Sequence, residues 1–540
     1  MPVVTTTTLR ARARGTDDGF ALVTVLCALL LAAIVTAAIV AASMKSSSNM
    51  KHASGQITAR SAADGGVQSI QQALHGERIT SPDGFAITSA KLSQWADASG
   101  ATTIPTASSA FPFVNSSGSG NTVLENASSS STDDGQTNYW QIVRQIAPSL
   151  TTDASFTTVY VRGWRQQTGQ ATATEPTVVK AQLRPGTFAD YQLISDQAIA
   201  FEPNMVVNGD IHSNGFIDGP SIPDPTKPQD RIWRKGSMTC QAVNGNLPPV
   251  ISTAKGDVDL AGIAGCTTRP DTANFIDFAR ARESYLRVTS NCYATGVHCF
   301  TSTSPAVPGT CTAAGCPYTV TLSAGSAVIK GPTGISSVAL SSTTQTALAF
   351  DRSVYVSGTP SGRISILAFH DVADANIAAP DIYLGSVLKP AVQPPNSATS
   401  IGIIAENNVI LASPANGCVS TVRAALIATA GSVTIPLAWR TPTYQSAMPQ
   451  CAQPLNFAGS MASHGAVTLR WTWGLPNSAN WSGYANRNYQ WDRSLRRFPP
   501  PYFPLSYPWE IVGSSMADAD CFGNGRFANA TVAADIDRCR

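Results

Sequence analysis

Four aspartates lie close together in the second half of the chain, and paired carboxylates are the first chemistry to consider. They are Asp351, Asp371, Asp374 and Asp381. Two carboxyl groups held ~5–10 Å apart can act as acid and base on a glycosidic bond. Acids at the corners of a repetitive β-structure are more often solvated. The sequence therefore favours a non-catalytic role for this group, and polysaccharide cleavage is the less favoured alternative.

Two histidines are candidate proton-transfer residues, and a third raises the question of zinc. His212 and His370 each have an aspartate nearby, but neither has a nucleophile in a recognised local motif, so we expect surface histidines. His298 precedes Cys299 in a spacing that matches no standard zinc pattern. No phosphate, zinc-helix or calcium motif occurs. The sequence predicts no catalytic residue, metal or cofactor.

The densest aromatic cluster of the chain lies near its C-terminus, mixed with arginines. Its members are Trp471, Trp473, Trp481, Tyr484, Tyr489, Trp491, Phe498, Tyr502, Phe503, Tyr507 and Trp509. Aromatic faces stack on sugar rings or partner side chains, so Trp481, Tyr484 and Trp491 form a candidate surface for a glycan or another surface ligand. The alternative, which we favour, is a cap that closes an exposed β-edge.

An apolar run near the N-terminus must position everything that follows. Residues 20–44 carry no charge, and Arg10, Arg12 and Arg14 precede them. A helix of this length spans ~37 Å, enough to cross a hydrocarbon core of ~30 Å. The basic leader predicts a single-pass protein with a cytoplasmic N-terminus and the bulk outside. Helix-like spacing continues to about residue 75. A secretory signal cut after residues 41–43 is an alternative, but its apolar core would be shorter.

A basic leader, then Gly19, then Phe20 opening this run resembles the prepilin signature of type IV pilins. The resemblance implies that a prepilin peptidase cuts between Gly19 and Phe20. Thr24 stands where major pilins carry glutamate, which directs the resemblance to minor, tip-located, PilX-like proteins. An ordinary signal anchor is the alternative.

The same resemblance implies contacts for the helix. Five apolar side chains would lie in the membrane and then against other pilin-like subunits and the assembly machinery: Leu22, Val25, Leu29, Leu30 and Ile34. Residues 350–510 also resemble the end of uncharacterised pilin-like exported proteins. Among the 36 basic residues arginine predominates, which fits a GC-rich, possibly actinobacterial, genome.

Charge and cysteine usage fit an exported protein. The formal net charge is +2 and only 13% of residues are charged, which argues against nucleic acid as a partner. Cys27 lies in the apolar run, and the other ten of the 11 cysteines favour disulfides outside the cytoplasm. Cys292 with Cys299 and Cys311 with Cys316 are close enough to pair locally, although sequence alone does not fix the pairing.

The chain divides by composition into a predicted order of segments. We expect a leader (1–19), a transmembrane and pilin-like helix (20–76), a low-complexity loop region (77–138), a β-meander (139–200), a β-solenoid (201–221 and 345–470), a cysteine-rich insertion (222–344) and an aromatic-rich C-terminal cap (471–540). Within the insertion, residues 271–288 have the pattern of an amphipathic helix.

Short apolar strands joined by polar corners support the solenoid. Ile403 to Ala405 turns through Asn407 and Asn408 into Val409, and similar units recur at uneven intervals. Each coil cannot bury its apolar face alone, so stacked coils share one interior. The predicted fold is mainly β with one long N-terminal helix: a pilin-like helix and meander, then an irregular parallel β-helix. A β-sandwich is the alternative.

These observations together predict a non-catalytic structural or assembly protein. The favoured role is a pilin-like minor component of a type IV pilus or related surface filament. The alternative is a membrane-anchored adhesin or glycan-binding protein.

Overall fold

The computed structural model describes most of the chain between residues 18 and 516. The described residues are 18–75, 124–125, 136–146, 157–167 and 177–516, the last without 198, 201–205, 216, 219–237, 242–248, 255–262, 270–274, 293, 302–315, 344, 371–377, 393–398, 414–416, 441–449 and 473–480. Most of the predicted loop region, the leader before Asp18, and Asp371 and Asp374 lie outside them.

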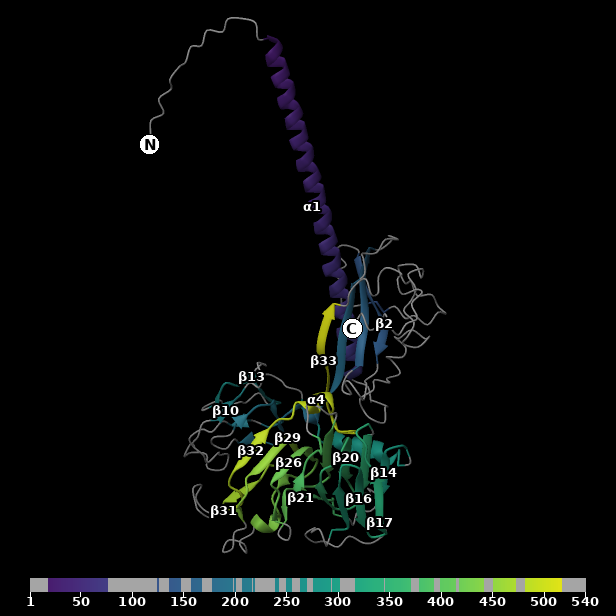
Figure 1. Ribbon diagram of the computed structural model, residues 1–540, viewed down its shortest axis with the longest axis vertical. Helices are drawn as coiled ribbons and strands as arrows, with labels where there is room; N and C mark the ends of the chain where they lie inside the picture. The colour runs from purple at the N-terminus through teal and green to yellow at the C-terminus, as the bar shows by residue number, and fades with distance from the viewer. Residues whose placement is uncertain are drawn as a thin grey trace, which may run out of the picture.

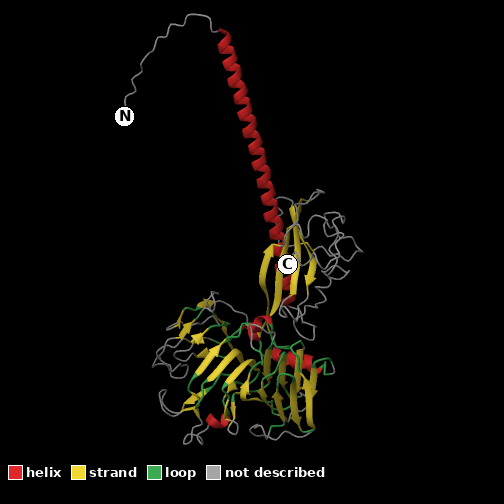
Figure 2. Cartoon of the chain, viewed as in Figure 1, coloured by secondary structure: helices red, strands yellow, loops and turns green. Residues whose placement is uncertain are grey.

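A single long helix leads into a head made mainly of strands (Figures 1 and 2). Helix α1 (Asp18–His75) contains 58 residues and projects well beyond the head. It has no proline, and apolar or small residues fill most of its first half. The predicted fold class, mainly β with one N-terminal helix, is confirmed.

The C-terminal half of α1 packs on an antiparallel sheet. Its strands are β1 (Leu124–Glu125), β2 (Gln136–Ile146), β3 (Thr157–Gln167), β4 (Thr177–Thr187) and β33 (Leu505–Met516), in the order β1-β2-β3-β4-β33. The first strands form a meander, and the fifth comes from the other end of the chain. The predicted C-terminal cap therefore needs correction, because its residues 505–516 pair with β4 instead.

The head contains ten parallel strands stacked in one ladder. In spatial order they are β13 (Thr267–Arg269), β11 (Val250–Thr253), β8 (Ile211–Ser213), β5 (Leu193–Ser195), β29 (Leu455–Ser463), β26 (Thr421–Ala428), β22 (Ser400–Ala405), β20 (Arg363–Ala368), β18 (Gln345–Phe350) and β14 (Val297–Phe300). Stacked parallel registers of this kind are those of a parallel β-helix, and they contradict the β-sandwich alternative.

Shorter ladders form the other sides of the coils. One runs β15 (Tyr318–Leu322), β19 (Val354–Gly358), β21 (Ile382–Leu388), β23 (Val409–Ile410) and β27 (Val433–Thr434); others join β7 (Val206–Val207) with β10 (Met238–Cys240) and β12 (Ile263–Ala264), and β6 (Ile199–Ala200) with β9 (Ile217–Asp218).

Further strands extend these ladders. Three of the additions are antiparallel: the hairpin β16 (Ser326–Gly331) and β17 (Gly334–Ala339) extends β15, β24 (Ala412–Ser413) pairs with β25 (Gly417–Cys418), and β30 (Arg470–Thr472) pairs with β31 (Trp481–Tyr484). Two are parallel: β28 (Gln450–Cys451) pairs with β31, and β32 (Arg487–Gln490) pairs with β29.

The chain enters the stack in its middle, which sequence reasoning did not anticipate. From β5 it builds outward through β8 and β11 to β13, then passes through α3 (Arg280–Thr289) to β14 at the opposite end. It then builds inward to β29, which pairs with β5. The segment 222–344 is therefore not an insertion, because β10 to β15 belong to the parallel ladders of the stack.

The two faces of the main ladder are both covered, which explains its strongly apolar strands. Alternate residues such as Ile364, Ile366 and Ile403 fill the interior of the coils. The intervening Leu367 and Ile404 pack outward against α3 and the C-terminal segment. Helix α3 begins at Arg280 rather than 271.

Residues 499–503, here called the crossing segment, lie across the outer face of the main ladder. Arg363 donates to the Pro499 carbonyl (Nε to O, 3.0 Å) and the Ser365 hydroxyl donates to the Pro501 carbonyl. Gly402 leaves the space that Pro500 and Phe503 occupy. After this segment the chain enters β33. The predicted cap is thus wrong for a second reason: β32 and this segment lie along the middle of the stack.

Candidate membrane anchor and assembly surface

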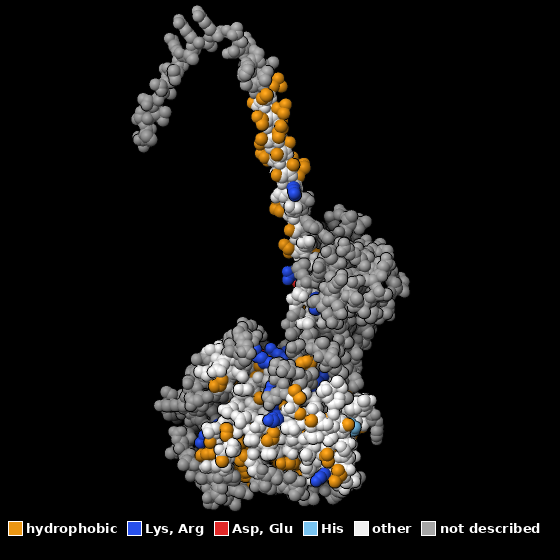
Figure 3. All heavy atoms as spheres, in the orientation of Figure 1, with side chains coloured by type: hydrophobic (Ala, Val, Ile, Leu, Met, Phe, Trp, Pro, Cys, Tyr) orange, Lys and Arg blue, Asp and Glu red, His pale blue; other side chains and the backbone are white. Residues whose placement is uncertain are grey.

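The N-terminal half of α1 exposes an apolar surface around its whole circumference. Val25–Ser47 contains 23 residues, and none of its most apolar window is buried in this chain. Its length of ~34 Å matches the hydrocarbon core of a bilayer. Among the described residues this is one helix segment with the length and composition to cross a membrane. Figure 3 shows apolar side chains, in orange, along this part of the helix.

The predicted membrane residues lie on this exposed half. Leu29 is 63% and Leu30 is 60% exposed, and Val25 and Ile34 are similarly open. Leu22, Gly19 and Phe20 lie in the first turns of α1, where only the backbone is described. Thr36 donates its hydroxyl to the Ala32 carbonyl (Oγ1 to O, 2.6 Å), so this polar group is satisfied within the helix.

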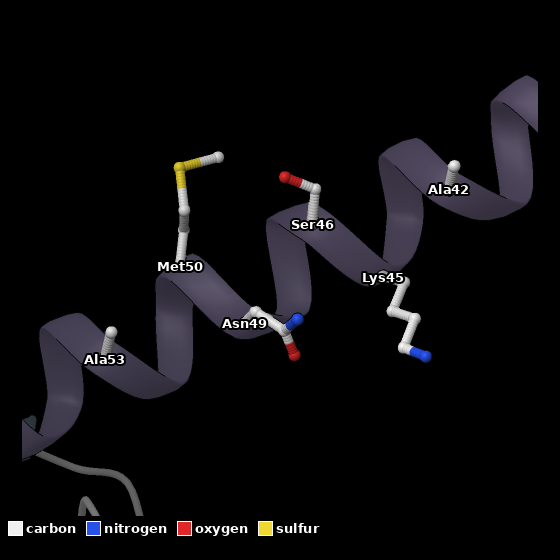
Figure 4. A pocket seen from close by; sticks show the side chains of 6 residues that line it. All are labelled: Ala42, Lys45, Ser46, Asn49, Met50 and Ala53. Carbon is white, nitrogen blue, oxygen red and sulfur yellow. The ribbon is translucent and has the colours of Figure 1, made fainter.

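The apolar surface ends in a short polar stretch. Ala42, Lys45, Ser46, Asn49, Met50 and Ala53 line a shallow, open hollow along this part of the helix (Figure 4). Lys45 and Asn49 extend to one side and Met50 to the other. A lysine near the end of a membrane-length segment can keep its ammonium group in the interface. This stretch separates the exposed half of α1 from its packed half.

The C-terminal half of α1 packs against the antiparallel sheet. Ala63, Val67 and Ile70 are buried against β3 and β4 residues such as Val161 and Ala181. At Gly66 a Cβ would lie 2.6 Å from the Trp140 ring, so only glycine lets that ring lie on the helix. These contacts make α1 a rigid continuation of the antiparallel sheet.

The three aromatic residues predicted as a ligand surface have different environments. Trp481 is half-buried on β31, with the Arg470 guanidinium 4.9 Å from its ring centroid. Tyr484 is fully buried; its hydroxyl donates to the Leu411 carbonyl (2.5 Å) and accepts from the Val419 amide. Burial raises the pKa of Tyr484. Tyr484 is therefore a core residue, and its place in a ligand surface is a correction.

Trp491 serves as packing between distant parts of the chain. Its amide donates to Asn208 Oδ1 (2.7 Å), and its indole N–H donates to the Ala189 carbonyl (3.3 Å). Its ring lies against Gly209, and the Arg496 guanidinium is 4.8 Å from the ring centroid. The ring is therefore engaged by the chain itself.

A more exposed aromatic surface lies one strand away. Trp471, on β30, is 38% exposed, and the Arg440 guanidinium lies 5.9 Å from its ring centroid. Leu437, from the same short helix as Arg440, is also exposed. Sequence reasoning included Trp471 only as one member of the aromatic cluster, because nothing local shows which rings the fold leaves open.

The described aspartates have structural partners. Asp381 Oδ1 accepts from the Asn408 amide (2.9 Å) and from Asn408 Nδ2 (3.0 Å). Burial raises the pKa of Asp381, and these hydrogen bonds oppose that shift. Asp351 is buried, and the Tyr318 hydroxyl is 3.4 Å from its Oδ1. Both carboxylates tie adjacent coils together.

The two candidate histidines are also part of the scaffold. His212 is buried, not on the surface as expected; Ser252 Oγ and Asn214 Oδ1 lie 3.1 Å from its two ring nitrogens. Desolvation lowers its pKa to about 4. His370 Nδ1 lies 2.5 Å from Glu406 Oε2, and Glu406 also binds Arg282 of α3. These contacts join the outer helix to a coil corner.

Three disulfides join described residues: Cys240–Cys266, Cys292–Cys299 and Cys418–Cys451. The local pairing of Cys292 with Cys299 is confirmed. This disulfide contains the sulfur of Cys299, the residue next to His298. No group of potential metal ligands occurs among the described residues. Cys316 is also disulfide-bonded, and Cys311 lies outside the described residues. Cys27 is free and exposed on α1.

No protein-family model and no curated protein sequence gives a significant match to this chain. Among solved structures, the chain is similar to the competence-associated pilin ComZ from Thermus thermophilus. The two are 11% identical, the match covers 86% of this chain and 98% of that chain, and the TM-score is 0.33. A likeness of this size carries no conclusion about family or function.

Proposed function

We propose that this protein is a non-catalytic, pilin-like minor component of a type IV pilus or a related surface filament. In this role α1 crosses the membrane with its N-terminus in the cytoplasm and later packs against other pilin-like subunits and the assembly machinery. The head lies on the outer side, and Phe20 becomes the mature N-terminus after a prepilin peptidase acts.

One observation carries the proposal: α1 is a single helix with two different environments. Its second half is buried by the head's own sheet, whereas Val25–Ser47 is apolar and fully exposed in the isolated chain. An apolar surface of this size needs a membrane or neighbouring helices to cover it. The Gly19–Phe20 junction supplies the second support.

N-terminal sequencing of the protein from its native membrane tests the processing step. A chain that begins at Phe20 supports the proposal. An uncut Met1 leaves an ordinary anchor, and a start near Met44 means a secreted protein; both results contradict the filament role.

Leu30→Arg tests the membrane step. A charge at the middle of the segment costs about 2.5–3.5 kcal/mol of insertion free energy. We expect the variant to leave the membrane fraction, whereas Ile57→Arg, an exposed position of α1 beyond the segment, stays in it. Equal fractionation of the two variants would contradict the anchor.

A second candidate function is a glycan-binding or adhesive head on the same anchor. The observations in its favour are two separate, partly exposed rings, Trp471 and Trp481, each beside an arginine. It predicts binding of the full-length protein to a carbohydrate array. Trp471→Ala and Trp481→Ala should reduce that binding, whereas Trp491→Ala should act only through stability.

A further inference from the structure

Strand β17 (Gly334–Ala339) is an open edge at one end of the stack. It pairs antiparallel with β16, and among the described residues no other strand has a register with it. Strand β18, which follows it in the chain, pairs with β14 and β20 instead. In Figure 1 it lies at the margin of the head, on the side away from β10 and β31. Five of its six residues are exposed, and Ile335 is 72% exposed.

The hydrogen-bond pattern shows which backbone groups face outward. The Leu340 amide donates to the Gly325 carbonyl (2.9 Å), which continues the β16–β17 register by one pair. In an antiparallel ladder, bonded pairs alternate with non-bonded ones. The even-numbered residues of β17 therefore bond to β16. Ile335, Ser337 and Ala339 direct their amides and carbonyls to the free edge.

This edge lacks the usual protection against pairing. Exposed edge strands of soluble proteins carry charges, proline or bulges that prevent another strand from adding. Strand β17 reads Gly-Ile-Ser-Ser-Val-Ala, without charge or proline, and its register with β16 is continuous. By contrast, β13, the terminal strand at the other end of the main ladder, carries Arg269.

We propose that β17 is a self-recognition edge, which pairs antiparallel with β17 of a second copy of this chain. The three outward-facing residues are symmetric about Ser337. A two-fold axis at Ser337 places Ser337 opposite itself and Ile335 opposite Ala339. Each copy then contributes three N–H donors, which gives about six hydrogen bonds in a sheet continuous from β15 to its symmetry mate. No like charges meet across the pair.

The direction of the strands decides which molecules can meet. In Figure 1 the strands at this end of the head run along the same general direction as α1. Antiparallel pairing then points the two α1 helices in opposite directions. If the head is displayed outside the cell, as proposed above, the contact joins molecules on two facing surfaces rather than neighbours in one membrane. The self-pairing itself does not depend on that location.

A six-residue strand pair is a small interface. Stable complexes usually bury more than about 1,000 Å² in total, so one such contact is weak in solution. Many copies on facing surfaces would strengthen it through effective concentration. The contact therefore suits reversible association between surfaces.

Symmetric cross-linking of the full-length protein in detergent tests the pairing. The background is Cys27→Ser, which removes the exposed thiol of α1. Opposed residues in a bonded antiparallel pair have Cα atoms about 5.5 Å apart, within disulfide reach. We expect Ser337→Cys to form a covalent dimer under mild oxidation, several-fold more than Ser336→Cys, whose symmetry mate lies diagonally across.

Adding Ile335→Lys to Ser337→Cys places charges on the edge and should reduce the dimer to the background level. Leu437→Lys, an equally exposed position elsewhere, should leave it unchanged. Equal dimer yields from Ser337→Cys and Ser336→Cys would overturn the proposal, as would a yield insensitive to Ile335→Lys. Cross-linking in native membranes only to a different protein would also overturn it.

Discussion

The ion pair between Arg184 and Asp190 should be among the most costly interactions to break in the head. It lies where the chain leaves β4 and enters the stack. Arg184 Nη1 is 2.5 Å from Asp190 Oδ1, and the Thr187 amide donates to Asp190 Oδ2 (2.7 Å). Both charged side chains are only 4% exposed.

Asp190→Ala removes one member of this buried pair. The Arg184 charge then stays in a poorly solvated site, and the Thr187 amide loses its acceptor. Breaking a buried pair in this way costs about 3–5 kcal/mol of unfolding free energy. Asp64→Ala is the control, because its pair with Arg60 on α1 is 43% and 54% exposed. Such a surface pair contributes only about 0.3–0.5 kcal/mol.

Urea unfolding of the full-length protein in detergent, followed by near-UV circular dichroism, measures this difference. A second arm replaces both partners, as Arg184→Met with Asp190→Leu, and should recover part of the lost stability because no unpaired charge remains. The reasoning is refuted if Asp190→Ala costs no more than Asp64→Ala, or if the double variant is as unstable as the single one.

Two further perturbations test the stack itself. The pKa of His212 is about 4 in the folded protein and 6.5 in an unfolded chain, so the unfolded chain binds a proton first as the pH falls. The free energy of unfolding should therefore fall by about 3 kcal/mol between pH 6.5 and 4, and His212→Gln should lose this contribution; an unchanged pH profile in urea titrations would count against it. Gly402→Ala places a Cβ 2.7 Å from Pro500 Cβ and should cost about 1–3 kcal/mol, whereas Gly325→Ala meets open space. Thermal unfolding that ranks these two variants equally would show that the crossing segment is not tightly packed.

Sequence patterns identified the elements that depend on local composition. The apolar run and the proline-free stretch after it predicted a helix over 20–76, and the structure has α1 at Asp18–His75. A β-meander was predicted over 139–200, where the structure has β2, β3 and β4, and the short spacing of Cys292 and Cys299 showed that these two could pair. These features are set by residues within a few positions of one another.

Long-range pairing is what the sequence left open. Nothing in residues 505–516 indicates that they pair with β4, more than 300 residues earlier, or that β29 pairs with β5. Because the coils differ in length, β11 and β14 were not recognised as strands of the stack, and the segment that contains them was predicted to be an insertion. A short strand pairs with any neighbour of suitable register, so only the competition among all the strands selects one partner.

The exposure of individual side chains also depends on long-range contacts. Tyr484 and Trp481 have similar sequence contexts, yet one is in the core and the other is half-buried beside Arg470. His212 appears as a polar corner residue in the sequence, but it is enclosed because Ser252 of the neighbouring strand β11, together with the nearby Asn214, contacts its ring.

The sequence by itself determined that a long helix with an apolar, membrane-length half precedes a β-rich, disulfide-bonded head. Helix formation and the length of the apolar segment depend on local composition, which can be determined from the sequence alone. Only the tertiary structure decided where the chain enters the stack, which rings are buried and that β17 is left without a second neighbouring strand in the described part of the chain. Those properties depend on which distant segments cover a surface, and that outcome is a balance among contacts spread over the whole molecule.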